Sequence, residues 1–348
     1  MGVQTRARLS PRLIASLDAA RAAAAGYVVL HHVADSRGWT HGAGIVFRFG
    51  QEAVLVFFLL SGFVIFANER VRAARPAGYL LRRLRRIYPA LLVAIGVSTL
   101  VALDNGDLAA RFSWRELAGT MLCLQDIALL KPGVIVEPYL QNTPLWSLSY
   151  EVAFYLAFPP VLALWRRRPR LANHLIGLVC CAAYAAYALA PNHWSLVAAY
   201  FLVWWAGAMA ADGYLRGGGD VRAVGATFGW LLALCGVAAA VTGVVGYRGP
   251  GVYPFLPLRH FLVAAGMLAA LYSGLGRRIA AICESLARPA ADAASVSYGL
   301  YVLHYPLLVV WRRAWTPAGL ALALGLVLAA AWLTDRKLNQ WLPRAPAT

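Results

Sequence analysis

The sequence predicts an all-α, polytopic membrane protein with about ten transmembrane helices. Of its 348 residues, 61% are hydrophobic and 14% are charged, whereas a typical soluble domain has roughly a quarter of its residues charged. The apolar residues also form runs of about 17 or more, the length that crosses the hydrocarbon core of a bilayer. We therefore interpret residues 1–348 as a single transmembrane domain with no appended soluble domain.

The apolar runs define the expected spans in order. They cover residues 13–34, 49–67, 87–103, 146–165, 174–190, 195–211, 223–245, 255–273, 293–311 and 318–334. The segment 114–130 is amphipathic and is interrupted by charged and amide residues, so we expect it to lie on the outer membrane surface. Counting it as a span would put the basic cluster 166–170 outside, against the positive-inside rule.

The net charge of +17 would suggest nucleic acid as the partner of a soluble protein. Here the basic residues lie between the apolar runs, at 70–86, 166–170, 216–222 and 277–288, so membrane topology explains them. The expected partner is the lipid bilayer, with no nucleic acid. The rule places these loops and both termini in the cytoplasm. Arg312 and Arg313 fall on the outer side and count slightly against this topology.

The first span, LDAARAAAAGYVVLHHV, carries an arginine near its start and a histidine pair near its end. Arg21 and His32 are eleven residues apart, about three helical turns, so they share one face and lie about 16 Å apart along the axis. His31 points roughly 80° away from that face. Ionisable groups within a span usually face a protein interior or a wet cavity, although Arg21 could instead snorkel to the headgroups.

Two later spans carry polar stripes. Ser147, Glu151 and Tyr155 recur every four residues, and Tyr301 and His304 follow Ser297 at spacings of four and three, so each set shares one helix face. Pro306 is expected to kink the helix just beyond. Glu151 could instead form a structural ion pair, and His304 could simply hydrogen-bond a neighbouring helix.

The five cysteines show no metal-binding pattern. They have no CxxC spacing and no nearby histidine ligand set, so neither a metal site nor a disulfide framework is expected. They are Cys123, Cys180, Cys181, Cys235 and Cys283.

The first-span motif resembles the signature of membrane acyltransferase family 3, in which an Arg or Lys is followed, after ten intervening residues, by a His. Four more segments match in the same order: AVLVFFLLSGFVI at 53–65, RRLRRIYP at 82–89, PLWSLSYEVAFYLAFP at 144–159 and SYGLYVLHYPLL at 297–308. The ordered set is specific, although no single segment is. Many members carry an acidic residue where this chain has Leu55, with Glu52 three residues earlier.

The resemblance implies transfer of an acyl group, often acetyl, from a cytoplasmic donor to a sugar hydroxyl across the membrane. The chain is then expected in the cytoplasmic membrane of a bacterium. Acyl-CoA would be the donor substrate, a sugar, glycan or glycolipid the acceptor, and no cofactor would be bound permanently. Acyl transfer to an alcohol needs a base, a stabiliser of the developing oxyanion and a place for the donor.

Roles can be assigned on this basis. We expect His32 to act as the general base, Glu151 to orient and support it, and Arg21 to hold a phosphate or carbonyl oxygen of the donor. The guanidinium groups that could bind CoA phosphates are Arg82, Arg83, Arg85 and Arg86. The residues expected to bind substrate are Trp146, Ser147, Tyr155, Tyr301 and His304.

Three alternatives stay open. Ser61, in LSGF, could be a nucleophile, but Ser-Gly pairs in membrane helices more often serve close packing. The whole chain could also be a transporter or flippase for a lipid-linked sugar or organic acid, with interior His and Glu residues relaying protons. The absence of an internal sequence repeat weakens the transporter hypothesis. The third alternative is a catalytically silent assembly protein, which would not need His32 and Glu151 to be ionisable.

Overall fold

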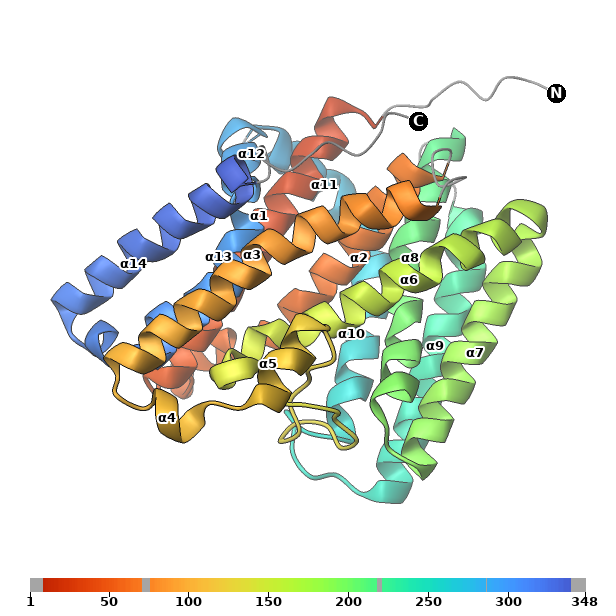
Figure 1. Ribbon diagram of the computed structural model, residues 1–348. Helices are drawn as coiled ribbons and strands as arrows, with labels where there is room; N and C mark the ends of the chain where they lie inside the picture. Colours follow the sequence, from red (N-terminus) through yellow and green to blue (C-terminus); the bar gives the residue numbers. More distant parts are fainter. Residues whose placement is uncertain (1–8, 71–75, 218–220, 286, 339–348) are drawn as a thin grey trace.

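The computed structural model describes residues 9–70, 76–217, 221–285 and 287–338. Within these ranges the regular structure is helical, and the β-type pairing is limited to an isolated bridge between Gln125 and Val136 (Figure 1). The all-α prediction is therefore confirmed. Parts of two predicted cytoplasmic loops, residues 71–75 and 218–220, lie outside the described residues.

Eight helices in the described ranges are long and apolar enough to cross a membrane. They are α1 (Pro11–Ser36), α2 (Gly50–Glu69), α3 (Pro76–Asp104), α6 (Trp146–Arg167), α7 (Pro169–Leu189), α8 (His193–Gly217), α9 (Val221–Val245) and α14 (Pro317–Trp332) with its π-helical extension η6 (Leu333–Leu338). The multi-pass membrane prediction is confirmed by this set.

The two remaining predicted spans differ from the others. The ninth is broken, because α12 (Ala287–Ala294) and α13 (Ser297–His304) with the π-helical η4 (Tyr305–Val310) meet at a bend of 48°. The bend therefore falls before α13, whereas Pro306 lies in the π-helical turn beyond it. The other predicted span coincides with α10 (Phe255–Leu271), an apolar helix of 17 residues, about 25 Å long.

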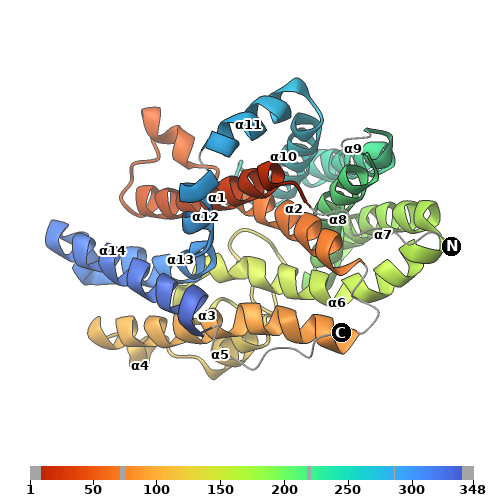
Figure 2. The same ribbon diagram turned by 90° about the horizontal axis from the view of Figure 1, so that it is seen from above.

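Close helix contact in the bundle depends on small residues. A Cβ atom on Gly62 of α2 would lie 1.9 Å from the backbone oxygen of Trp204, and one on Gly207 of α8 would lie 2.0 Å from that of Leu59. Small residues let membrane helices approach in this way without a hydrophobic driving force. In Figures 1 and 2, α7, α8 and α9 form one side of the molecule, and α13 and α14 form the other.

The segment 114–130 does not form a membrane-spanning helix. Its helical part, α5 (Trp114–Met121), is eight residues long and begins at the Ser113 N-cap, near the short helix α4 (Leu108–Arg111). Beyond it the chain folds inward, so that the buried Asp126 and Lys131 pair at 2.6 Å. The loop continues through the short 3-10 helices η2 (Tyr139–Gln141) and η3 (Thr143–Leu145) into α6.

The outward arginines have local acidic partners. Arg313, in η5 (Arg312–Trp315), donates from Nε to Asp104 at 2.7 Å, and Arg312 lies 3.8 Å from Asp107. Asp104 ends α3, so these pairs join two loops at the same end of the bundle. Pairing with nearby carboxylates thus accounts for Arg312 and Arg313 on the predicted outer side, where the positive-inside rule expects few basic residues.

The first and last spans share one end of the bundle. At the start of α1, which follows the Ser10 N-cap, Arg12 pairs with Glu284 of α11 (Gly274–Ser285) at 2.6 Å. Arg336, late in the last span, pairs with Asp292 of α12 at 2.8 Å. Figure 2 shows α11 and α12 lying across this end of α1. The arrangement fits an even number of crossings, and the cytoplasmic assignment of this end stays a prediction.

Candidate functional site

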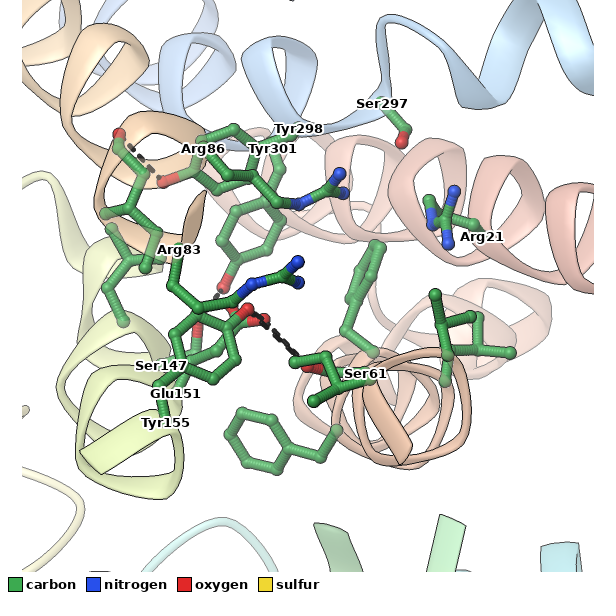
Figure 3. A pocket seen from close by; sticks show the side chains of 17 residues that line it. Arg21, Ser61, Arg83, Arg86, Ser147, Glu151, Tyr155, Ser297, Tyr298 and Tyr301 are labelled. Atoms are coloured by element: carbon green, nitrogen blue, oxygen red, sulfur yellow. Dashed lines mark hydrogen bonds between the residues drawn. The ribbon is translucent and has the colours of Figure 1, made fainter. Parts of the chain in front are cut away.

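Five helices enclose a central cavity among the spans. Its polar lining comes from Arg21 of α1, Ser61 of α2, Arg83 and Arg86 of α3, Ser147, Glu151 and Tyr155 of α6, and Ser297, Tyr298 and Tyr301 of α13. Figure 3 shows the three guanidinium groups projecting toward the space between α1, α3 and α6. Sequence motifs from distant parts of the chain therefore meet at one place.

Glu151 is the carboxylate of the central cavity. Its Oε1 accepts hydrogen bonds from Ser61 Oγ, at 3.1 Å, and from the Tyr155 hydroxyl (Figure 3). Trp204 Nε1 donates to Ser61 Oγ at 3.2 Å, which leaves the serine proton directed to the carboxylate. Glu151 makes no hydrogen bond to His32 in this structure, because it faces the central cavity and His32 does not line that cavity.

The predicted arginine set is divided. Arg83 and Arg86 line the central cavity, whereas Arg82 forms a two-pronged ion pair with the buried Glu69, at 2.9 and 2.6 Å. Arg85 does not line the cavity. On α3, Arg85 projects about 100° from Arg86 and about 160° from Arg83. Arg82 projects only about 40° from Arg86, so its ion pair with Glu69, and not the helical spacing, distinguishes it from the lining arginines.

The lining arginines have few acidic partners. Arg21 pairs with Asp18 at 3.3 Å, and Arg83 lies 3.5 Å from Glu69. Arg86 makes no hydrogen bond or ion pair with another residue in the described part of the chain, although it faces the same space as Arg21. Guanidinium groups gathered in this way favour an anionic ligand.

A second chamber adjoins the central cavity. It shares Arg21, Arg86 and Tyr298 with that cavity and adds Asp18 and Asp335. Its remaining lining comes from Ala291, Ala294 and Ser295. Asp18 belongs to the early part of α1, the two alanines to α12 and Asp335 to the last turn of the final span, so the second chamber lies toward the end of the bundle that carries α12.

His32 belongs to a separate histidine cluster, formed by His32, His304 and Tyr305. The His32 ring centroid lies 5.3 Å from that of His304 and 5.1 Å from that of Tyr305. Nε2 of His32 and Nε2 of His304 are both buried without a hydrogen-bond partner in the structure. His32 therefore has its ring nitrogen Nε2 in the protein interior, but it does not line the central cavity that Arg21 lines.

His31 faces elsewhere, as the helical geometry predicts. Its Nδ1 contacts the backbone oxygen of Phe47 in η1 (Gly42–Phe47), and a Cβ on Gly50 would lie 2.1 Å from its ring. His31 therefore fixes η1 and the start of α2 against α1. This is a packing role that the sequence could not distinguish from a site role by residue type.

Tyr301 and His304 connect the histidine cluster to the central cavity. The Tyr301 hydroxyl lies 2.8 Å from Ser147 Oγ and donates to the Pro144 backbone oxygen at 2.6 Å. The Tyr301 and His304 ring centroids are 6.3 Å apart. His304 Nδ1 donates to the Leu300 oxygen at 3.1 Å, so a neutral His304 has its lone pair on Nε2.

The candidate Trp146, and Glu52, whose role the sequence left open, also lie outside the central cavity. Trp146 is buried against Lys131, whose Nζ is 3.9 Å from the indole centroid, and it does not line the central cavity. Its neighbour Ser147 does, because adjacent residues project about 100° apart on a helix. Glu52 pairs with Arg259 of α10 and lies 3.8 Å from His260, so it joins α2 to α10 rather than facing the cavity.

Sequence reasoning missed Ser61, Tyr298 and Asp335 as site residues. Ser61 was weighed as a packing residue, and its partner Glu151 is ninety positions away. Tyr298 lies within the matched motif at 297–308, three residues before Tyr301, so the helical spacing was an available signal. Among the described residues, no group of three or more His, Cys, Asp or Glu could hold a metal ion.

Comparison with known proteins gives a consistent result. The family model described as "Acyltransferase domain" matches residues 14–336. The exopolysaccharide production protein ExoZ of Rhizobium meliloti is 28% identical over 85% of this chain and 86% of its own length. Nodulation protein 10 of Rhizobium leguminosarum bv. viciae is 31% identical over 41% of each chain.

A further relative is longer than the matched region. The peptidoglycan O-acetyltransferase OatA of Listeria monocytogenes is 29% identical over 47% of this chain, and the match spans 27% of OatA. The chain thus matches well under half the length of both Nodulation protein 10 and OatA. No solved structure matches the chain.

Proposed function

The chain belongs to membrane acyltransferase family 3, whose model covers residues 14–336, and we propose that it transfers an acyl group, acetyl in the first instance, from cytoplasmic acyl-CoA to a glycan hydroxyl. It is an O-acetyltransferase-like membrane enzyme by this membership. ExoZ is named for exopolysaccharide production and OatA for peptidoglycan O-acetylation. Both names support a sugar or glycan acceptor, and we place the chain in the cytoplasmic membrane of a bacterium.

The observation that carries the proposal is the central cavity. Arg21, Arg83 and Arg86 come from two helices and face one space beside Glu151 and a row of hydroxyl groups. Ionisable side chains within membrane spans cost free energy to bury, so the ones that occur there usually have a function. The lining arginines have few acidic partners, and the phosphate groups of a CoA donor would pair with them through short charge-assisted hydrogen bonds.

The donor site is proposed at the junction of the two chambers. Arg21 and Arg86 line both of them, so a donor entering through the second chamber would meet these guanidinium groups first. Arg83 lines only the central cavity, with its guanidinium carbon 5.9 Å from the Tyr155 ring centroid. CoA is too charged to cross lipid, and its pantetheine arm would carry the acyl group into the central cavity.

The acceptor hydroxyl is proposed to be activated at the histidine cluster. His32 stays our candidate general base, and its unpartnered Nε2 is available to take a proton. His304 faces it with its own Nε2 free of hydrogen bonds. Glu151 is proposed to act in the central cavity, where it holds Ser61 and Tyr155 in place and balances part of the arginine charge.

Purified protein in nanodiscs tests the proposal directly. Radiolabelled acetyl-CoA is the donor, and octyl glucoside serves as a surrogate sugar hydroxyl. Transfer of label to the glucoside, with stoichiometric release of CoA, is the expected result. The matched control is Arg12→Gln, which removes an exposed arginine of the same helix, against Arg21→Gln. Uptake of an intact lipid-linked sugar into sealed vesicles without acyl transfer would instead support the transporter hypothesis.

A further inference from the structure

We propose that Asp335, in the last turn of the final span, is a positioning residue of this enzyme. It caps the N-terminus of α13 and thereby sets where Tyr298, Tyr301 and His304 lie. The proposal rests on the proposed function for its kinetic consequence. The cap itself can be measured without any activity.

The cap satisfies a helix end that begins inside the bundle. Asp335 Oδ2 accepts a hydrogen bond from the backbone N–H of Gly299 at 2.8 Å. The first N–H groups of any α-helix lack partners within the helix. At α13 the N-cap residue is Val296, whose apolar side chain makes no cap hydrogen bond, so a residue from another span supplies the acceptor.

Close backbone contact reinforces the cap. A Cβ atom on Gly299 would lie 2.6 Å from Thr334 Oγ1 and 2.7 Å from the Ala331 Cα. Only glycine therefore fits at this point without displacing α13 from the last span. Asp335 and the contact at Gly299 together fix the depth and rotation of α13 where the broken span bends by 48°.

Three residues of α13 depend on that placement. Tyr298 lines both chambers, Tyr301 bonds Ser147 in the central cavity, and His304 packs against His32. Because α13 is only eight residues long, a shift at its start moves all three together. A misplacement of about 1 Å at a site can cost about 100-fold in rate.

Asp335 could act through its negative charge near Arg21 and Arg86 as well as through the helix cap. Two substitutions separate the effect of the charge from the effect of the cap. Asp335 lines the second chamber with Arg21 and Arg86. Asp335→Asn keeps an oxygen that can accept from the Gly299 N–H but removes the charge, whereas Asp335→Ala removes both. Asp292→Ala is the matched control, because Asp292 is an exposed partner of Arg336 at the same end of the bundle.

Hydrogen–deuterium exchange of the purified full chain measures the cap. Peptides covering 295–304 should exchange about tenfold faster in Asp335→Ala, the size expected for loss of a typical N-cap. Asp335→Asn and Asp292→Ala should resemble the wild type. Gly299→Ala should also raise exchange in this segment. Equal exchange in the wild type and Asp335→Ala would overturn the cap.

Kinetics with acetyl-CoA and octyl glucoside measure the consequence. For Asp335→Ala we expect kcat to fall about tenfold or more while KM for acetyl-CoA does not rise, because the donor arginines lie on α1 and α3 and the loss of a carboxylate beside them does not weaken phosphate binding. Asp335→Asn should restore most of kcat. If Asp335→Asn were as impaired as Asp335→Ala, charge rather than capping would explain the loss and the proposal would be overturned. A wild type without transfer activity would refute the proposed function, and the exchange measurement would still decide the cap.

Discussion

Ser61 Oγ lies 3.1 Å from Glu151 Oε1, although ninety residues separate the two in sequence. The contact joins the LSGF segment of α2 to the polar stripe of α6 inside the central cavity. Trp204 holds the serine from a third helix. The carboxylate is therefore positioned by three spans, and its role can be tested apart from that of the histidines.

Replacing Glu151 should cost more activity than replacing either of its hydroxyl partners. Glu151→Gln keeps the shape but removes the charge beside Arg21, Arg83 and Arg86, and we expect transfer to fall about 100-fold, in the range seen for loss of a preorganised electrostatic group. Ser61→Ala removes one of two donors to the carboxylate and should cost less than about tenfold, in line with a single hydrogen bond. Transfer of label to octyl glucoside at matched protein amounts is the measurement. A loss from Ser61→Ala as large as that from Glu151→Gln would point to serine as a nucleophile.

The two adjacent histidines should behave differently. His32→Ala should lower transfer about 10²- to 10⁴-fold, the usual range for loss of a general base. His31→Ala should retain most activity, because His31 contacts the Phe47 backbone and the Gly50 region rather than His304. Rates at matched expression decide the question, and a thermal melt shows whether His31→Ala loosens η1. Equal losses from both substitutions would contradict the assignment.

The arginines of α3 should separate into donor and structural groups. Arg86→Gln should raise KM for acetyl-CoA and reduce its dependence on salt, because a screened phosphate contact is removed. Arg82→Gln should leave KM nearly unchanged but lower stability by about 1–3 kcal/mol, since Glu69 would keep its charge while losing a close partner. Donor titrations at low and high salt, together with thermal melts, distinguish the two. Equal effects of both substitutions on KM would mean that a diffuse basic surface binds the donor.

Much of this organisation could be predicted from the sequence, because it depends on local periodicity. Spans follow from apolar run length, and the facing of Arg21, His32 and Tyr301 follows from 3.6 residues per turn. The side-chain partners within the site could not be predicted, because they depend on which helices pack against one another. The sequence predicts that Glu151 supports His32, because both are ionisable and lie within spans. In the structure the Glu151 carboxylate instead accepts hydrogen bonds from Ser61 and Tyr155.

Neighbours on one helix were also hard to separate without the fold. The sequence could not assign Arg82 to Glu69 and Arg86 to the cavity, because both lie in the same basic motif. Trp146 was expected to bind substrate beside Ser147, yet it packs against Lys131 in the loop before α6. In each case a partner on another segment of the chain, Glu69 for Arg82 and Lys131 for Trp146, accounts for a side chain that does not reach the cavity.

The membrane orientation gives the last prediction. The basic cluster at the α6–α7 junction should be cytoplasmic and the loop after α5 should be outside, because positive charge is retained on the cytoplasmic side. Arg170→Cys and Leu129→Cys place thiols at exposed positions of these two segments. A membrane-impermeant maleimide added to intact cells should label Leu129→Cys and should label Arg170→Cys only after permeabilisation. A background variant lacking the five native cysteines is the control for specificity. Labelling of Arg170→Cys in intact cells would invert the topology, and the arginine chambers would then open away from the cytoplasmic pool of acyl-CoA.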